Sequence, residues 1–160
     1  MDFNRLPPPK FEWVQLNDVL DSVVRLLGSD AQMKNARIET HFQKKLPLLK
    51  MDVSQISLAV SNLLINSIQA VSEKGEIHLF TRGSKKNIFI VLEDNGGGIS
   101  KENLPKIFDF MFSTKPMGSG LGLSIAKKIV SDHHGEITVK SEMNRGSIFR
   151  IRIPVSQRGS

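Results

Sequence analysis

Cysteine is absent from this 160-residue sequence, and aromatic residues make up only 6% of it. The lack of cysteine excludes disulfide bonds and thiolate metal sites within the chain. No apolar run approaches the length that spans a membrane, and the N-terminus has no apolar region typical of a signal peptide. An apolar fraction of 39% over this length predicts one soluble domain with a full hydrophobic core.

The net charge of +6 and the pI near 9.7 raise the question of a nucleic-acid partner. The basic residues are scattered, however, and no recognised nucleic-acid motif accompanies them. Near the C-terminus, Phe149 and Ile151 alternate with Arg150 and Arg152, which predicts a sheet with one buried face and one wet, basic face. A solvated basic surface explains the charge better than a nucleic-acid site does.

Three parts are expected along the chain. Residues 1–10 contain the run Pro7-Pro8-Pro9 and predict an extended linker from a preceding segment. Residues 11–156 are expected to form the domain. Residues 157–160 end in Gly-Ser, which indicates a tail or a remnant of cloning.

Apolar spacing and chain breakers predict the secondary structure. Strands are expected at 11–14, 37–43, 76–82, 87–94, 136–141 and 147–153. One helix is expected after a cap at Asn17 or Asp18, with apolar positions at helical spacing from Val19 to Leu27, and further helices are expected at 53–72, 101–107 and 120–134. Residues 108–119 show no clear period and are expected to form a mobile loop.

Two asparagines stand four residues apart in the predicted helix 53–72, for which Asp52 is the expected N-cap. The apolar residues of this segment form one stripe that should face the core. Asn62 and Asn66 fall together on the opposite side, one helical turn apart. Asparagine is a mediocre helix former, so a pair on one mid-helix face favours a function. The plain alternative is a pair of solvated polar residues.

A carboxylate followed by glycines ends the predicted strand 87–94. Asp94 supplies one fixed anion, and the loop Gly96-Gly97-Gly98 allows the backbone to approach a flat ligand closely. A second glycine segment, residues 118–123, opens the last predicted helix, where backbone N–H groups attract phosphates. Together with the asparagine pair, these segments predict a nucleotide site. Taken singly, Asp94 could cap a turn, and the glycines could be ordinary loop punctuation.

Four ordered blocks of the sequence resemble those of the ATP-binding catalytic domain of sensor histidine kinases, a relative of DNA gyrase, Hsp90 and MutL. The blocks are Asn62-Leu63-Leu64-Ile65-Asn66, Asp94-x-Gly96-x-Gly98-Ile99, Phe108-Asp109-Phe110-Met111-Phe112-Ser113-Thr114-Lys115 and Gly118-x-Gly120-Leu121-Gly122-Leu123. The resemblance implies a Bergerat-type ATP-binding fold. This is an α/β (α+β) two-layer sandwich, in which three helices cover one face of a mixed, mostly antiparallel sheet.

The resemblance also implies roles for the site residues. Asp94 would accept a hydrogen bond from the adenine amino group and so disfavour guanine. Asn66 would give its amide oxygen to Mg²⁺, with Asn62 as a second metal and catalytic position. Lys115 would be the catalytic cation for the β- and γ-phosphates, the plain alternative being a surface lysine. The other expected contacts to ATP or ADP are Ala70, Gly96, Gly98, Ile99, Phe108, Gly118, Ser119, Gly120, Leu121, Gly122 and Leu123. Phe108, Phe110 and Phe112 should bury their rings and anchor the loop.

Two positions depart from the family pattern. Gln69 and Ala70 stand where many histidine kinases carry a lysine and an aromatic residue, so contacts from that helix to the nucleotide should be weaker or different. Asn62 stands where gyrase-like hydrolases carry a glutamate that activates water. Because an amide accepts no proton near neutral pH, this position favours phosphoryl transfer over hydrolysis.

The reaction implied by the resemblance is transfer of the γ-phosphoryl group of Mg-ATP to a histidine on a separate helical dimerisation domain, to which residues 1–10 would lead. None of the four histidines sits in an acceptor context or shows a metal-like pattern, and surface or helix-end roles are predicted for them: His41, His78, His133 and His134. Expected partners are that domain and a response regulator, in the cytoplasm, with a monomeric isolated domain and a homodimeric full-length kinase. The alternatives are a gyrase-like ATPase, a nucleotide-binding module without catalysis, and a basic nucleic-acid binder.

Overall fold

A computed structural model describes residues 6–110, 112 and 122–155 of the chain. The strands are β1 (Glu12–Val14), β2 (Arg37–Phe42), β3 (Leu49–Met51), β4 (Glu76–Gly83), β5 (Asn87–Asp94), β6 (Glu136–Glu142) and β7 (Gly146–Pro154). The helices are α1 (Leu16–Met33), α2 (Val53–Ala70) and α3, described over Gly122–Asp132, with a 3₁₀ turn η2 at Leu104–Lys106. Every predicted strand is present, and β3 is an additional one.

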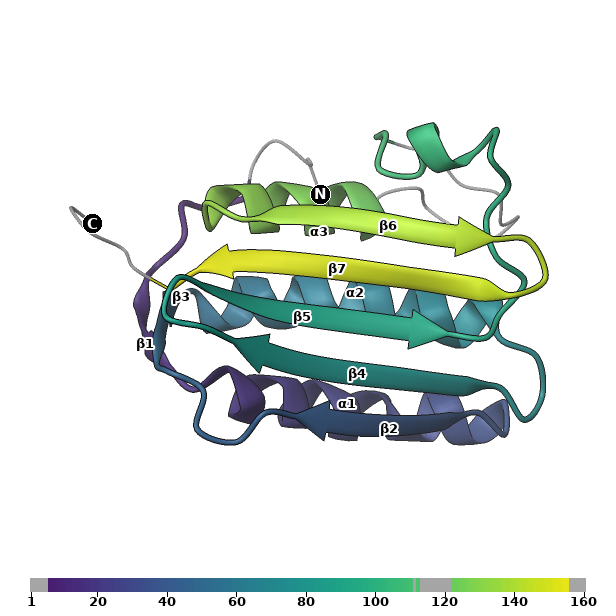
Figure 1. The fold of residues 1–160 in the computed structure, drawn as a ribbon, viewed down its shortest axis with the longest axis horizontal. Coiled ribbons are helices and arrows are strands. Elements are labelled where there is room, and N and C mark those ends of the chain that lie inside the picture. Colours follow the sequence, from purple (N-terminus) through teal and green to yellow (C-terminus); the bar gives the residue numbers. More distant parts are fainter. Residues whose placement is uncertain (1–5, 111, 113–121, 156–160) are drawn as a thin grey trace.

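The three helices lie side by side against one face of a five-stranded sheet (Figure 1). The strand order is β2-β4-β5-β7-β6. β2 and β4 run parallel, whereas the other neighbouring strands are antiparallel. β4 and β5 form an antiparallel hairpin, and β1 pairs with β3 in a separate two-stranded sheet. The predicted fold, a mixed and mostly antiparallel sheet covered on one face by three helices, is confirmed.

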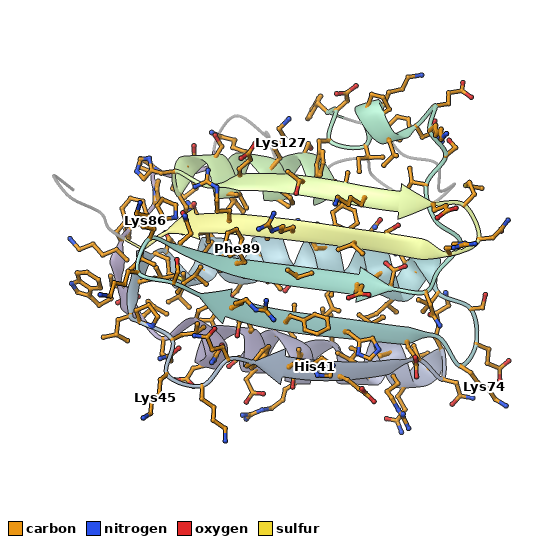
Figure 2. The ribbon with its side chains drawn as sticks, viewed as in Figure 1. His41, Lys45, Lys74, Lys86, Phe89 and Lys127 are labelled. Carbon is orange, nitrogen blue, oxygen red and sulfur yellow. The ribbon has the colours of Figure 1, made fainter. Side chains whose placement is uncertain are left out.

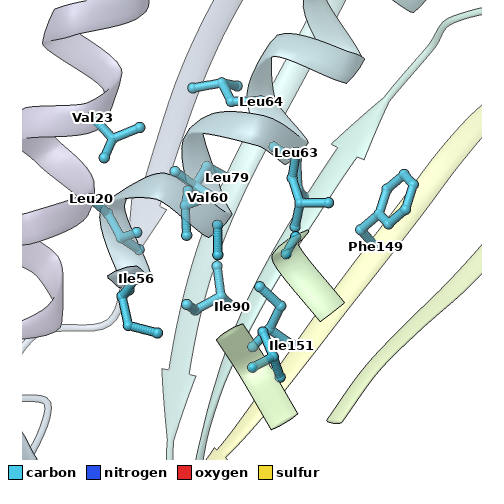
Figure 3. Close-up of a cluster of buried hydrophobic side chains, with 14 of the residues drawn as sticks. Leu20, Val23, Ile56, Val60, Leu63, Leu64, Leu79, Ile90, Phe149 and Ile151 are labelled. Carbon is cyan, nitrogen blue, oxygen red and sulfur yellow. The ribbon is translucent and has the colours of Figure 1, made fainter. Parts of the chain in front are cut away.

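The hydrophobic core fills the space between the helices and the sheet. Figure 3 shows Val60 and Leu63 of α2 in the same cluster as strand residues Leu79, Ile90 and Ile151. All five are buried, with at most 2% of their surface exposed. Burying a side chain of this size stabilises a fold by about 1.5–3 kcal/mol. Because strand residues alternate, the residues between them face away from the helices.

Helix α2 is held at both ends by side chains. The predicted N-cap is confirmed: the side chain of Asp52 accepts a hydrogen bond of 3.0 Å from the backbone N–H of Gln55. At the other end, the ammonium group of Lys34 donates to the carbonyls of Ile68, Gln69 and Val71 at 3.1, 3.1 and 2.7 Å. These carbonyls belong to the last turn, where a helix leaves acceptors without partners.

Two predictions about the helices are wrong: the N-cap of α1 and the helix at 101–107. The N-cap of α1 is Gln15 and not Asn17 or Asp18, because the Asn17 amide is used elsewhere. It donates to the carbonyl of Gln43 and accepts from the Thr81 hydroxyl, both at 2.9 Å. The segment 101–107 forms turns and the short η2 instead of a helix. Its proline lies in the first turn of η2 and provides no N–H donor.

Residues 7–10 lie against the start of α2. The backbone N–H of Lys10 donates to Asp52 at 2.8 Å, and the side chain of Gln55 donates to the carbonyl of Pro7 at 2.8 Å. Residues 1–5 and 156–160 are outside the described residues, so the division into linker, domain and tail stays a prediction. Among the helices that the structure describes, none is long and apolar enough to cross a membrane.

Candidate functional site

Asp94 lies at the end of β5 and is the anchor of the site. Its side chain is on the helical side of the sheet, and the residue is only 7% exposed. One carboxylate oxygen accepts from the Ser67 hydroxyl at 3.0 Å, and the other accepts from the backbone N–H of Gly96 at 2.9 Å. Hydrogen bonds to an ionised acceptor are stronger than neutral ones, so this orientation is well fixed. A carboxylate has about four acceptor positions, and these two donors use two of them.

Helix α2 contacts both the end of β5 and the first described turn of α3. Ser67, which touches Asp94, follows Asn66 directly in the sequence, and Asn66 is half-buried. One turn earlier, the side-chain amide of Asn62 donates to the carbonyl of Gly122 at 3.2 Å. The structure therefore brings Asp94, the asparagine pair and the first described turn of α3 to one helix. Their roles towards a ligand stay predictions.

The first glycine loop packs against the protein's own backbone. A Cβ on Gly96 would lie 2.7 Å from the carbonyl oxygen of Ala70, and the N–H of Gly97 donates to the same oxygen at 3.3 Å. Gly98 has a φ of +80°, and a Cβ there would overlap with the carbonyl of Glu142. These contacts within the fold explain why Gly96 and Gly98 lack side chains. Ala70 contributes its carbonyl to this loop.

The phenylalanine segment is only partly buried. The Phe108 ring packs edge-to-face on Phe149, with ring centroids 6.3 Å apart, and Phe112 is partly buried against the core. Phe110, in contrast, is 57% exposed, so the prediction that its ring is buried is wrong. Ile99 is fixed through its backbone N–H, which donates to the Ser141 hydroxyl at 2.7 Å.

Part of the predicted phosphate site lies outside the described residues. This applies to Lys115, Gly118, Ser119, Gly120 and Leu121. Gly122 and Leu123, which begin the described part of α3, are half-buried. A Cβ on Gly122 would meet the Asn62 side chain at 3.7 Å, an ordinary contact distance, so α2 leaves room at this position.

Ser67 is a site residue whose role is not apparent from the sequence. It occupies the apolar stripe of α2 and is completely buried. A buried hydroxyl needs a hydrogen-bonding partner, and Asp94 supplies it. The signal that could have revealed the pair is a small polar residue inside a stripe of core residues.

His133 lies directly after α3, which agrees with the helix-end role predicted for it, and its side chain is buried. Its Nδ1–H donates to the carbonyl of Ile129 at 2.8 Å, so its Nε2 accepts the backbone N–H of Asp52 at 3.0 Å. Burial lowers the pKa of His133, against the opposing effect of the Ile129 hydrogen bond. Burial tends to raise the pKa of Asp52, but N–H donors from Lys10 and Gln55 outweigh it and lower that pKa. The network joins residue 10, α2 and the end of α3.

The structure also groups His41 and His78, for which no metal-like pattern is visible in the sequence. The structure places one ring nitrogen of each histidine and a carboxylate oxygen of Glu39 within 4.8 Å of one another. The group lies on the outer face of the sheet, away from α2. The pairing of β2 with β4 brings the three residues together. Because His41 and His78 are 37 positions apart, no local sequence pattern indicates the cluster.

Comparison with known proteins decides the family. The model of the histidine kinase-, DNA gyrase B-, and HSP90-like ATPase family matches residues 51–157. The chain belongs to this ATPase family. The matched range includes all four sequence blocks, so the resemblance that these blocks indicate is confirmed.

Curated relatives of this ATPase domain are sensor kinases. Sporulation kinase C of Bacillus subtilis is 32% identical over 146 residues, and so is the sensor histidine kinase ZraS of Salmonella typhimurium. Each alignment covers 91% of this chain but only 34% or 31% of the relative. The chain thus spans about a third of the length of the curated relatives that it matches.

Solved structures show the same relationship. The nucleotide-free catalytic domain of the histidine kinase ThkA has a TM-score of 0.83 at 28% identity, covering 91% of this chain and 96% of that one. ThkA in complex with the response regulator protein TrrA has a TM-score of 0.81 at 25% identity, covering 95% and 44%. Full-length ShkA in complex with AMPPNP has a TM-score of 0.86 at 21% identity, covering 99% and 35%, and supports the fold. This ATPase domain is therefore of the type found in histidine kinases.

Proposed function

We propose that the chain is the catalytic, ATP-binding part of a sensor histidine kinase and transfers the γ-phosphoryl group of Mg-ATP to a histidine on a separate dimerisation domain. The observation that carries the proposal is the convergence on α2. Ser67 holds Asp94 at 3.0 Å, and Asn62 holds the start of α3 at 3.2 Å. The names of two curated relatives, Sporulation kinase C and the sensor histidine kinase ZraS, support the same reaction.

The adenine end of the site is assigned to Asp94. The carboxylate is nearly buried and is oriented by the Ser67 hydroxyl and the Gly96 N–H, so little conformational entropy is lost when a ligand donor binds to it. The amino group of adenine is such a donor, whereas guanine presents an oxygen at that place. The site should therefore prefer ATP to GTP.

The phosphate end is assigned to the start of α3 and to Asn66. Backbone N–H groups at a helix start attract anions, and Gly122 and Leu123 carry such groups. The amide oxygen of Asn66 is the hard donor that Mg²⁺ prefers, and Asn66 lies on the same helix as the Ser67–Asp94 contact, so these residues fit the ion. When bound, Mg²⁺ neutralises phosphate charge. Lys115 remains the predicted cation for the β- and γ-phosphates.

Asn62 decides between transfer and hydrolysis in this proposal. Its amide donates to the carbonyl of Gly122 and so positions the helix that faces the phosphates. An amide does not take a proton from water near neutral pH, so this residue cannot act as a general base for hydrolysis. Phosphoryl transfer depends mainly on positioning and charge neutralisation, which these residues provide.

The proposed partners follow from the reaction. They are the histidine-bearing dimerisation domain of the same kinase and a response regulator, of which the ThkA–TrrA complex is an example in a similar protein. The domain alone is proposed to be a cytoplasmic monomer, and the full-length kinase a homodimer. Nucleic acid is not proposed as a partner.

Incubation of the chain with γ-³²P-ATP, Mg²⁺ and its upstream helical domain supplied in trans tests the proposal. The wild type should label a histidine of the helical domain, identified by the acid lability of the phosphate. Asn66→Ala should reduce the label to background. Gln32→Ala is the control, since it removes an exposed amide from α1 and should leave labelling unchanged.

Other outcomes would identify the alternatives. Steady phosphate release by the isolated chain, without labelling, would identify a gyrase-like ATPase. ATP binding without labelling or release would identify a nucleotide-binding module. Labelling that persists in Asn66→Ala would contradict the metal role of Asn66 but leave the kinase assignment intact.

A further inference from the structure

The outer face of the sheet carries a cluster of possible metal ligands that is separate from the ATP site. Glu39 and His41 are two residues apart on β2 and therefore share one face of the sheet. Glu39 pairs in register with His78 on the parallel strand β4. On β4, Ile77 and Leu79 are completely buried towards the helices, so His78 between them faces outward. Figure 2 shows His41 on this outer face, in front of β2.

The ligand atoms of the three residues have the spacing of a metal site. Nε2 of His41 and Nδ1 of His78 are hydrogen-bonded at 2.9 Å, a bond whose proton a shared ion would displace, and one Glu39 carboxylate oxygen, Oε2, lies 3.9 and 3.6 Å from them. The centre of a triangle with these sides lies about 2.0 Å from each atom. Zinc binds imidazole nitrogen at about 2.0–2.1 Å and carboxylate oxygen at about 2.0–2.2 Å.

Neighbouring side chains hold these ligands in place. The Phe80 ring stacks on His41 with centroids 4.6 Å apart and planes at 19°. Arg37 binds the other carboxylate oxygen of Glu39, Oε1, at 3.3 Å, which orients Oε2 towards the histidines. A carboxylate oxygen of Glu76 lies 3.8 Å from Nε2 of His78, the nitrogen that faces away from the cluster, which is an ion-pair distance and too long for a direct hydrogen bond.

We infer that Glu39, His41 and His78 bind a divalent transition-metal ion, with Zn²⁺ as the best match, and that water completes its coordination. Two imidazoles and a carboxylate form a donor set that suits zinc, and they do not suit Mg²⁺, which prefers oxygen ligands. All three side chains are partly exposed, at 42% for His41, 28% for His78 and 40% for Glu39, so water can reach the ion.

The cluster lies where a bound ion would join two neighbouring strands. β2 is an edge strand and pairs with β4 alone among the strands of the sheet. An ion shared by Glu39 and His41 of β2 and His78 of β4 would cross-link the two strands. Because the folded chain presents the assembled ligands and the unfolded chain does not, binding should raise the melting temperature.

The remaining histidines cannot reproduce this site. Both ring nitrogens of His133 are engaged inside the protein, and His134 is exposed on the turn after α3. The chain has four histidines and no cysteine. His134→Ala is therefore a matched control, because it removes an exposed histidine without touching the cluster.

Titration of the nucleotide-free chain with ZnCl₂ by calorimetry tests the inference independently of kinase activity. The wild type should bind one zinc ion and show a higher melting temperature with zinc. His41→Ala and His78→Ala should each weaken binding at least about tenfold and abolish the shift. Glu39→Gln should weaken binding less, and His134→Ala should show the zinc affinity and the zinc-induced rise in melting temperature of the wild type. An absence of one-to-one binding, or equal binding by His41→Ala and the wild type, would overturn the inference.

A measurement on the wild type alone guards against variants that misfold. Co²⁺ is a spectroscopic substitute for zinc, and NMR of the ¹⁵N-labelled chain should show paramagnetic effects centred on His41 and His78. Effects centred on His134, or on no histidine, would refute the site. Binding of ATP, measured separately, should not depend on these residues.

Discussion

The two faces of the five-stranded sheet differ sharply although the same strands supply both. The helical face consists mainly of apolar side chains such as Leu79, and it includes a buried carboxylate, Asp94, which the Ser67 hydroxyl and the Gly96 N–H orient. The outer face carries charged, aromatic and histidine side chains, including a cation–π contact of Arg150 with Phe89 at 4.2 Å. Alternation along a strand thus gives two chemically independent surfaces. Changes on one face should leave the other face unaffected.

The adjacent carboxylates Glu93 and Asp94 provide the sharpest test of this independence. Asp94→Asn should weaken ATP binding on the order of a hundredfold, because an amide nitrogen would replace an ionised acceptor in a nearly buried place. Calorimetric titration with Mg-ATP measures the change. Glu93→Gln, one residue earlier and on the outer face, should leave the affinity unchanged. Equal losses in both variants would mean that the two faces are not independent.

Neighbouring residues of β4 extend the comparison to stability. Leu79→Ala should lower the free energy of unfolding by about 3 kcal/mol, because it opens a cavity under α2. Phe80→Ala removes a larger ring from the outer face, yet it should cost only about 1 kcal/mol, the scale of a stacking partner on a sheet surface. Urea denaturation followed by circular dichroism gives both values. A larger loss for Phe80→Ala would show that the outer face is covered by further structure in solution.

Lys34 tests whether the helical layer depends on polar contacts as well as on its apolar core. Lys34→Met keeps the length of the side chain but removes three hydrogen bonds to the last turn of α2. The expected loss is about 1–2 kcal/mol in the free energy of unfolding. Lys44→Met, an exposed lysine after β2, is the control and should cost much less. Equal stability of the two variants would show that hydrogen bonds from water satisfy the α2 carbonyls as well as those from Lys34.

The buried side chain of His133 should make the stability of the fold depend on pH. Its folded-state pKa is lowered by burial, so the unfolded chain binds a proton more readily than the folded chain. Stability should therefore be constant well above pH 6.5 and fall as the pH drops through that value, the ordinary pKa of histidine. Protonation of Nε2 would also place an N–H against the Asp52 N–H that it now accepts.

Denaturation curves between pH 8 and pH 5 measure this loss. His133→Gln should be less stable at pH 8, and the fall in stability across this window should largely disappear. A fall of the same size in the variant would show that other groups cause it. Asp52, whose pKa is also lowered, acts in a separate window below pH 4, where its protonation should remove the α2 cap.

Local patterns account for most of the fold and for part of the site. The alternation in residues 147–153 predicts β7 correctly, and Asp52 is correctly identified as a cap because capping depends on residues three positions away. The cap of α1 is not predictable in this way, because distant Gln43 and Thr81 compete for the Asn17 side chain. A residue's identity alone does not reveal which partner it finds after folding.

The same limit applies to the sites. Asp94 and the asparagines are recognised by residue type and spacing, but the Ser67–Asp94 bond requires α2 to be docked on β5. The Glu39–His41–His78 cluster depends on the register between β2 and β4, set by a crossover of 33 intervening residues from 43 to 75. Residues whose side chains can bind a ligand or a metal can be identified from the sequence, whereas the contacts among them depend on the topology of the fold.

The attachment of residues 7–10 ties them to the same helix that contacts Asp94. Through Lys10 and Pro7, these residues are hydrogen-bonded to the first turn of α2, whose 18 residues span about 27 Å. Near the other end of α2, the hydroxyl of Ser67 donates to Asp94. One continuous helix, and not the sheet, is therefore the shortest covalent connection between the two contacts.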